Sequence, residues 1–215
     1  SPTLITMFTT TNHQPWVMPE NSSNKISKFS DKYFGKPQIL RTMAYTDHVI
    51  GEFMRENEGK EWFNNTIFVF ISDHGFNEFN GMYEDPRNAH IPFIIYSPNI
   101  ITNPKNIETI TSQVDVIPTL LHLIGYPNSF DLMGKNILTS NSNGFASRIV
   151  NDYALWLESN LIYTEIFNQQ SKAFEYSNIY TTPYNFISKK SKEFMEIQNN
   201  FHAYLQQSYK YYKNR

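Results

Sequence analysis

The sequence predicts an α/β fold, in which a mostly parallel sheet is flanked by helices and is followed by a C-terminal β-hairpin and helix. Two short apolar runs, residues 66–72 and 91–97, carry this prediction. Strands that helices cover on both faces of a parallel sheet have this nearly continuous apolar composition. A pattern of apolar residues at helical spacing precedes the first run, so strands and helices alternate along the first part of the chain.

The N-terminal elements follow from their residue patterns. Residues 3–10 are rich in β-branched and apolar side chains, which predicts a first strand. Apolar side chains recur at helical spacing over 38–57, which predicts an amphipathic helix that ends near Gly59. Residues 76–90 are polar, and we expect them to form a loop between the two buried strands.

The C-terminal third has a different pattern. Residues 118–124 read as a short helix with Pro118 in its first turn, and residues 126–150 read as a loop. Residues 161–167 and 172–176 flank a polar turn and predict a β-hairpin, and residues 190–212 predict a helix with one aromatic face. We therefore expect two parts, residues 1–140 and residues 141–215, with the hairpin and helix packing on the first part.

Composition excludes several function classes. The 215 residues are 40% hydrophobic, so the chain can fill a core, and their formal net charge of −2 gives no support for nucleic-acid binding. Cysteine is absent, which excludes disulfides, zinc–thiolate sites, iron–sulfur clusters and cysteine nucleophiles. The sequence also contains no glycine-rich phosphate loop and no Gly-x-Ser-x-Gly nucleophile motif.

The triplet Asp73-His74-Gly75 directly follows the first buried strand. The carboxyl ends of strands are where ligands bind in open α/β sheets. A carboxylate and a neutral imidazole suit Zn²⁺ or Mn²⁺, and Gly75 would let the backbone turn so that both side chains reach one ion. The alternative is a strand-end turn in which Asp73 and His74 only cap neighbouring backbone groups.

Two further histidines are candidates. His13 follows the first expected strand, where it could donate a hydrogen bond to a phosphate or sulfate oxygen or bind a metal; the alternative is an exposed polar turn. His90 precedes the second buried strand, which places it at the opposite end of a parallel sheet unless the long loop carries it over the site. The alternative is a histidine that only connects two elements. Asp115, at the start of a helix, is interpreted as structural.

Five segments in order resemble the sulfatase branch of the alkaline phosphatase superfamily, and in particular the lipoteichoic acid synthase and phosphoglycerol transferase group. They are residues 10–16 (Thr-Thr-Asn-His-Gln-Pro-Trp), 45–47 (Tyr-Thr-Asp), 65–75 (ending in Ser-Asp-His-Gly), 90–98 (beginning with His-Ile-Pro-Phe) and 112–121 (Ser-Gln-Val-Asp-Val-Ile-Pro-Thr-Leu-Leu). The resemblance fades after about residue 140, so residues 1–140 resemble the C-terminal part of a sulfatase-like catalytic domain.

The resemblance implies a two-step transfer, in which a threonine or serine attacks a phosphate or sulfate ester and a covalent intermediate is then released. It implies that Asp73 and His74 bind one divalent metal ion, and that His13 and, less closely, His90 contact the substrate. Mn²⁺ or Zn²⁺ suits this pair, and Mg²⁺ and Ca²⁺ suit it less well because they prefer oxygen ligands. The implied partner is an anionic phosphate or sulfate ester, which can be lipid-linked, and no nucleic acid.

In that family the nucleophile lies upstream of the segment that matches residues 10–16. We therefore expect no catalytic nucleophile in this chain, which would lack the N-terminal half of its own domain and be inactive alone. The resemblance also implies an extracytoplasmic location on a membrane-anchored parent. The alternatives are a true sulfatase, a phosphoethanolamine transferase, or a non-catalytic module of the same fold that binds an anionic glycan or lipid headgroup.

Overall fold

The computed structural model describes residues 3–17, 19, 37–76, 85–129, 131–139, 143–180 and 184–213. The chain divides into two compact units. The first contains residues 1–66 and 97–99, and the second contains residues 67–96 and 100–215. None of the described helices is both long enough and apolar enough to cross a membrane.

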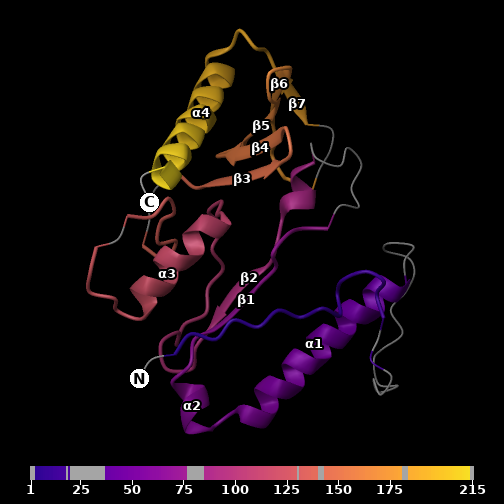
Figure 1. Ribbon diagram of the computed structural model, residues 1–215, viewed down its shortest axis with the longest axis vertical. Helices are drawn as coiled ribbons and strands as arrows, with labels where there is room; N and C mark the ends of the chain where they lie inside the picture. Colours follow the sequence, from indigo (N-terminus) through magenta and orange to yellow (C-terminus); the bar gives the residue numbers. More distant parts are fainter. Residues whose placement is uncertain are drawn as a thin grey trace. The chain divides into compact units, whose positions relative to one another are not determined.

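The first unit is built on helix α1 (Pro37–Asn57), which confirms the helix predicted over 38–57 (Figure 1). Ile39 and Leu40 are buried near its start, and Phe63 is buried in the short helix α2 (Glu61–Asn64). Gly59 lies just beyond α1 with φ +81°, a conformation that favours glycine. The apolar side chains at the N-terminal end of this helix are therefore buried, as the amphipathic pattern predicted.

The strand predicted over residues 3–10 is wrong for the described part of the chain. These residues are extended, but they belong to neither of the two sheets that the structure describes. Their large apolar side chains are 79–84% exposed; they are Leu4, Ile5, Met7 and Phe8. A β-branched, apolar sequence favours an extended backbone, but a strand also needs a neighbour to pair with.

In the second unit, β1 (Phe68–Ile71) and β2 (Phe93–Tyr96) occupy the two predicted buried runs. The α/β class is confirmed, but the parallel direction expected for this pair is wrong: the strands run antiparallel, with Phe68 opposite Tyr96 and Ile71 opposite Phe93. A parallel pair needs a long crossover, usually a helix. The described part of the connection holds only the 3-10 turn η1 (Pro86–Ala89).

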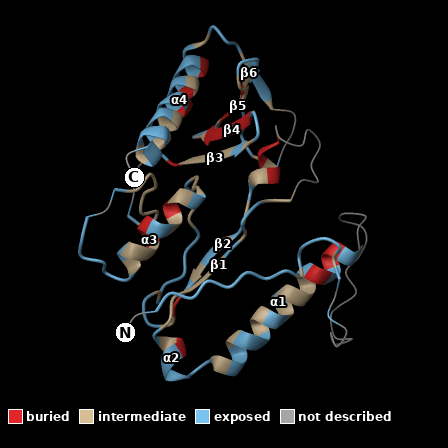
Figure 2. Ribbon diagram, viewed as in Figure 1, coloured by how far each residue is buried: buried red, intermediate tan, exposed pale blue. Residues whose placement is uncertain are grey.

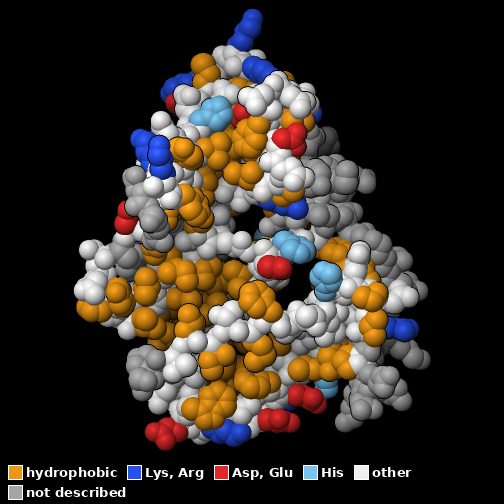
Figure 3. Space-filling model, viewed as in Figure 1, with side chains coloured by type: hydrophobic (Ala, Val, Ile, Leu, Met, Phe, Trp, Pro, Cys, Tyr) orange, Lys and Arg blue, Asp and Glu red, His pale blue; other side chains and the backbone are white. Residues whose placement is uncertain are grey.

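Helix α3 (Val116–Leu123) confirms the predicted short helix, and the 3-10 turn η2 (Gln113–Asp115) leads into it. Asp115 is buried and accepts hydrogen bonds from the backbone N–H groups of Ser112 (2.9 Å) and Lys135 (2.8 Å), which confirms its structural role. Hydrophobic side chains gather on the surface over α3 (Figure 3), where Ile117 and Ile124 are 50% and 60% exposed.

The C-terminal part is a five-stranded antiparallel sheet in sequence order followed by a helix. Its elements are β3 (Phe145–Val150), β4 (Tyr153–Glu158), β5 (Leu161–Ile166), β6 (Gln170–Glu175), β7 (Asn185–Ile187) and α4 (Lys192–Lys213). The predicted hairpin is β5 and β6, and the predicted helix is α4. The loop predicted over 126–150 is wrong at its end, because Ser147 and Arg148 interrupt the apolar pattern of β3 without breaking the strand.

The main core lies between this sheet and α4. Trp156 and Tyr163 on the sheet pack against Phe194, Ile197 and Phe201 on the helix. All five are at most 3% exposed. Figure 2 shows buried segments on both β4 and α4. A second buried cluster forms around Leu155 and Ile162, which face away from the helix because side chains alternate along a strand.

Parts of the preceding chain pack on this second cluster. Ala89 of η1 and Ile110 contact it, as does Tyr184 between β6 and β7. The C-terminal sheet therefore supports the turn that leads into β2, and it is more than an appendage to the α/β layer.

Tyr163 makes folding stability sensitive to alkaline pH. Its hydroxyl donates to Glu165 Oε2 at 2.7 Å, and burial together with this bond raises its pKa from 10.0 to about 12. The neutral phenol is favoured in the folded state, so its contribution is present below pH 10 and is lost as the pH rises toward 12. We expect urea unfolding to show a loss of roughly 1–2 kcal/mol across this range.

The matched variants are Tyr163→Phe, which should lose this part of the alkaline slope, and Tyr209→Phe on the exposed side of α4, which should keep it. An unchanged slope in Tyr163→Phe would contradict the assignment.

Candidate active site

The end of β1 and the start of β2 meet at one edge of their two-stranded sheet. Because the strands are antiparallel and Ile71 pairs with Phe93, the residues after β1 lie beside those before β2. Gly75 shows how close the two segments are, since a Cβ built on it would lie 2.2 Å from the carbonyl oxygen of Asn88. Only glycine permits this approach. Asp73, His74 and His90 flank this contact.

The antiparallel pairing changes the expected place of His90. A parallel strand would have put His90 at the opposite end of the sheet from Asp73 and His74. The antiparallel pairing instead brings all three residues to the same edge. Part of the loop predicted over 76–90 lies outside the described residues.

Asp73 and His74 are exposed and fixed by local hydrogen bonds. The backbone N–H of His74 donates to Asp73 Oδ1 at 3.0 Å. His74 Nδ1 lies 2.8 Å from the carbonyl oxygen of Gly75, and because a carbonyl only accepts, Nδ1 carries the proton. The neutral ring therefore presents the lone pair of Nε2, which is the form that binds a metal ion.

The pair fits one divalent ion. His74 Nε2 and Asp73 Oδ2 are 3.8 Å apart. Two ligand atoms at about 2.1 Å from one tetrahedral ion are about 3.4 Å apart, so a small side-chain rotation brings both onto a shared ion. Among the residues that the structure describes, no group of three or more His, Asp or Glu side chains could hold a metal ion. The described residues thus offer two ligand atoms that one ion could share.

Gln113 is a site residue that the sequence did not point to. Its side-chain amide donates to the carbonyl oxygens of Ser72 (3.1 Å) and Asp73 (2.8 Å) from the turn η2. These two bonds fix the backbone that carries Asp73 and His74. No local signal could have found this role, because the bonded residues are 40 and 41 positions apart in the chain.

His90 has a partner from the C-terminal sheet. The hydroxyl of Tyr180, between β6 and β7, lies 2.6 Å from His90 Nδ1, and the two rings are 5.9 Å apart. Asp85 caps the turn before His90 and pairs with Arg87. This hydrogen-bonded pairing raises the pKa of Arg87. Tyr180 was not predicted, because 90 residues separate it from His90.

His13 belongs to the first unit and lies in the turn after the extended segment. Its Nδ1 is 2.8 Å from the carbonyl oxygen of Gln14, so the proton is again on Nδ1. A neutral His13 therefore offers a lone pair at Nε2, and only its protonated form could donate there to an anion. The hydroxyl of Thr46 on α1 donates to Asn12 Oδ1 at 3.2 Å, which ties the turn to the helix.

The Gly75 contact gives a direct test of this edge. In Gly75→Ala the new methyl meets a backbone carbonyl of Asn88 that is itself buried, so neither side can move cheaply. We expect a loss of about 1–3 kcal/mol in the free energy of unfolding, measured in urea.

The matched control is Gly51→Ala in α1, where the nearest atoms belong to the flexible Arg55 side chain. It should gain about 0.5–1 kcal/mol, because alanine is the better helix former. A Gly75→Ala protein as stable as the parent would refute the close approach.

Comparison with known proteins gives the family context of this edge. The family model described as "Sulfatase" matches residues 1–126. A curated relative, the lipoteichoic acid synthase-like protein YvgJ of Bacillus subtilis, is 29% identical over 173 residues, which is 71% of this chain and 28% of YvgJ. Arylsulfatases of animals and of a bacterium are also among the curated relatives.

Solved structures share the fold. A protein in the alkaline phosphatase superfamily from Vibrio parahaemolyticus superposes with a TM-score of 0.73 at 19% identity, covering 93% of this chain and 48% of that one. BT4656, solved in complex with its substrate D-glucosamine-2-N,6-O-disulfate, gives a TM-score of 0.58 at 19% identity over 83% of this chain and 42% of that one. The chain thus spans under a third of YvgJ and about half of these solved proteins.

Proposed function

Because the chain belongs to the sulfatase family, we propose that it supplies the metal-binding and substrate-binding edge of an enzyme that transfers or hydrolyses a phosphate or sulfate ester. The observation that carries this proposal is the pair at the end of β1. Asp73 and His74 present Oδ2 and Nε2 within 3.8 Å of each other, and the hydrogen bond to Gly75 keeps the His74 lone pair available.

In this proposal Asp73 and His74 hold one Mn²⁺ or Zn²⁺ ion, to which a nitrogen and a carboxylate oxygen are suited. Such an ion, when bound, stabilises negative charge on a transferring group and lowers the pKa of a hydroxyl nucleophile. Gln113 keeps the backbone of this pair in place. His90, at the same edge, contacts an oxygen of the anionic ester. The substrate contact expected of His13, in the first unit, rests on the sequence resemblance alone.

A phosphoglycerol transferase or phosphodiester hydrolase is the first candidate. Its support is the match to YvgJ, which extends over 71% of this chain and so reaches beyond residues 1–126. A sulfatase is the second candidate. Its support is BT4656, which shares the fold and was solved with a sulfated sugar.

We also propose that the nucleophile of the reaction lies outside this chain. The described residues bring only two metal ligands together, and the chain spans 28% of YvgJ and 48% of the Vibrio protein. The 215-residue chain should then bind the ion without turning over substrate. Turnover of a phosphodiester by this chain, lost in Asp73→Ala, would refute this part of the proposal.

Metal binding tests the pair directly. Calorimetric titration of the chain with Mn²⁺ or Zn²⁺ should show one site, and His74→Gln or Asp73→Asn should weaken it by at least about 10-fold. Affinity should also fall as the pH is lowered, because His74 must be neutral to bind. The control His122→Gln removes an exposed histidine on α3 and should leave the affinity unchanged.

Activity of the gene product that contains this chain separates the candidates. Hydrolysis of bis(4-nitrophenyl) phosphate that is lost in Asp73→Asn supports the first candidate, and hydrolysis of 4-nitrophenyl sulfate supports the second. If neither ester is cleaved while sulfate or glycerol phosphate still binds, the enzyme proposal fails. A non-catalytic module that binds an anionic glycan or lipid headgroup then becomes the better account.

A further inference from the structure

His90 is the one histidine of the three site candidates whose Nδ1 faces a side chain. His74 and His13 both point Nδ1 at a backbone carbonyl, which fixes the proton there and leaves a lone pair at Nε2. His90 Nδ1 faces the hydroxyl of Tyr180, which can donate or accept. Its tautomer therefore depends on what Tyr180 does.

The distance favours donation by Tyr180. Its oxygen lies 2.6 Å from His90 Nδ1. An N–H donor to oxygen is typically about 2.9–3.0 Å away, whereas a hydroxyl donor approaches an acceptor oxygen more closely, to about 2.7–2.8 Å. The 2.6 Å contact is closer to the range of a hydroxyl donor. A hydroxyl that donates to Nδ1 leaves the proton of the neutral ring on Nε2. His90 would then present an N–H donor without carrying a charge.

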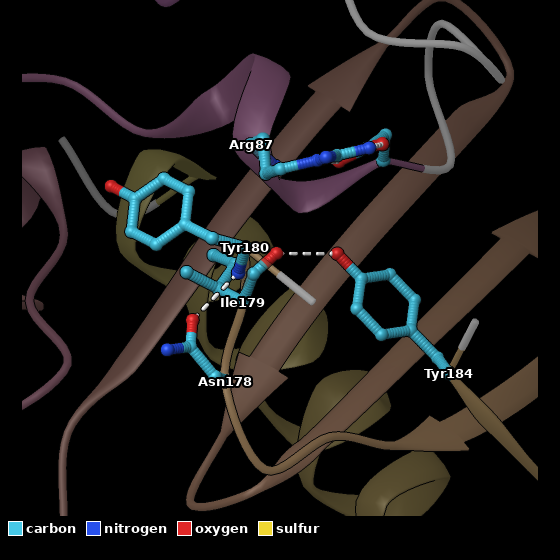
Figure 4. A network of polar contacts seen from close by, with 6 residues as sticks. Arg87, Asn178, Ile179, Tyr180 and Tyr184 are labelled. Atoms are coloured by element: carbon cyan, nitrogen blue, oxygen red, sulfur yellow. Dashed lines mark hydrogen bonds and ion pairs between the residues drawn. The ribbon is translucent and has the colours of Figure 1, made fainter. Parts of the chain in front are cut away.

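Local contacts hold the segment that carries Tyr180 in place. The backbone N–H of Tyr180 donates to Asn178 Oδ1 at 2.8 Å, and the hydroxyl of Tyr184 donates to the carbonyl oxygen of Ile179 at 2.7 Å (Figure 4). Arg87 lies close to this network, and burial together with the nearby Asp85 carboxylate raises the pKa of Tyr184. Tyr184 also packs on the second cluster of the C-terminal sheet.

The turn before His90 rests on the same cluster through Ala89. Ala89 and Ile179, the neighbours of His90 and Tyr180 in the chain, therefore pack on the same cluster. His90 Nε2 has no hydrogen-bond partner among the described residues, which leaves it available to a ligand.

We propose that Tyr180 is a positioning residue that holds His90 as the neutral Nε2–H tautomer, so that His90 donates a hydrogen bond to an oxygen of the anionic ester. This inference rests on the proposed function for the identity of the ligand, but the tautomer itself does not. It divides the site chemically: His74 offers a lone pair to a metal ion, and His90 offers a proton to an anion.

The test is a ¹H–¹⁵N correlation spectrum of the imidazole nitrogens in the ¹⁵N-histidine-labelled chain, recorded at pH ~8. His90→Gln identifies the His90 signals by their absence. In the parent chain His90 should carry its proton on Nε2. In Tyr180→Phe, which keeps the ring, the preference for that tautomer should fall by roughly 3- to 10-fold.

Tyr176→Phe is the matched control. The hydroxyl of Tyr176 donates to the carbonyl oxygen of Ser159 and does not contact His90. It should leave the His90 tautomer unchanged. A proton on Nδ1 of His90 in the parent chain, or an unchanged tautomer in Tyr180→Phe, overturns the proposal.

A sulfate titration separates this inference from the proposed function. Sulfate should shift the His90 Nε2–H signal, with an affinity about 3- to 10-fold weaker in Tyr180→Phe. If the tautomer is as expected but sulfate leaves His90 unaffected, the positioning by Tyr180 stands and the substrate role proposed for His90 fails.

Discussion

The candidate site depends on the close backbone approach of Gly75 to Asn88. A side chain at position 75 would collide with a buried carbonyl, so the two strand ends meet only because glycine is there. The antiparallel pairing of β1 and β2 creates this meeting, and Gln113 then fixes the backbone of the first segment. The pairing places Asp73, His74 and His90 at one edge, and the glycine lets the two backbones approach there closely.

The C-terminal sheet supports this edge from a second direction. One of its faces is filled by α4, and the other carries Ala89 of the turn before His90 and Tyr184 from its own long loop. Tyr180 reaches the imidazole of His90 from that loop. The sheet therefore supports one part of the candidate site through residues that lie far apart in the sequence.

The sequence predicted what short-range pattern determines. Helical spacing located α1 and α4, and apolar runs located β1 and β2. The Asp-His-Gly triplet pointed to the two side chains that we propose as metal ligands, and that role stays a prediction. It failed where long-range pairing decides the outcome. The direction of β2, the absence of residues 3–10 from both described sheets, and the partners Gln113 and Tyr180 all depend on contacts between distant segments, for which one sequence carries no local signal.

The central claim is that Asp73, His74 and His90 lie at one edge, and paramagnetic broadening by Mn²⁺ tests it most directly. In the ¹⁵N-histidine-labelled chain, substoichiometric Mn²⁺ should broaden the imidazole signals of both His74 and His90 and should spare His202 on α4. Broadening of His74 with a sharp His90 signal would contradict the shared edge. An absence of broadening at His74 would contradict the metal pair itself.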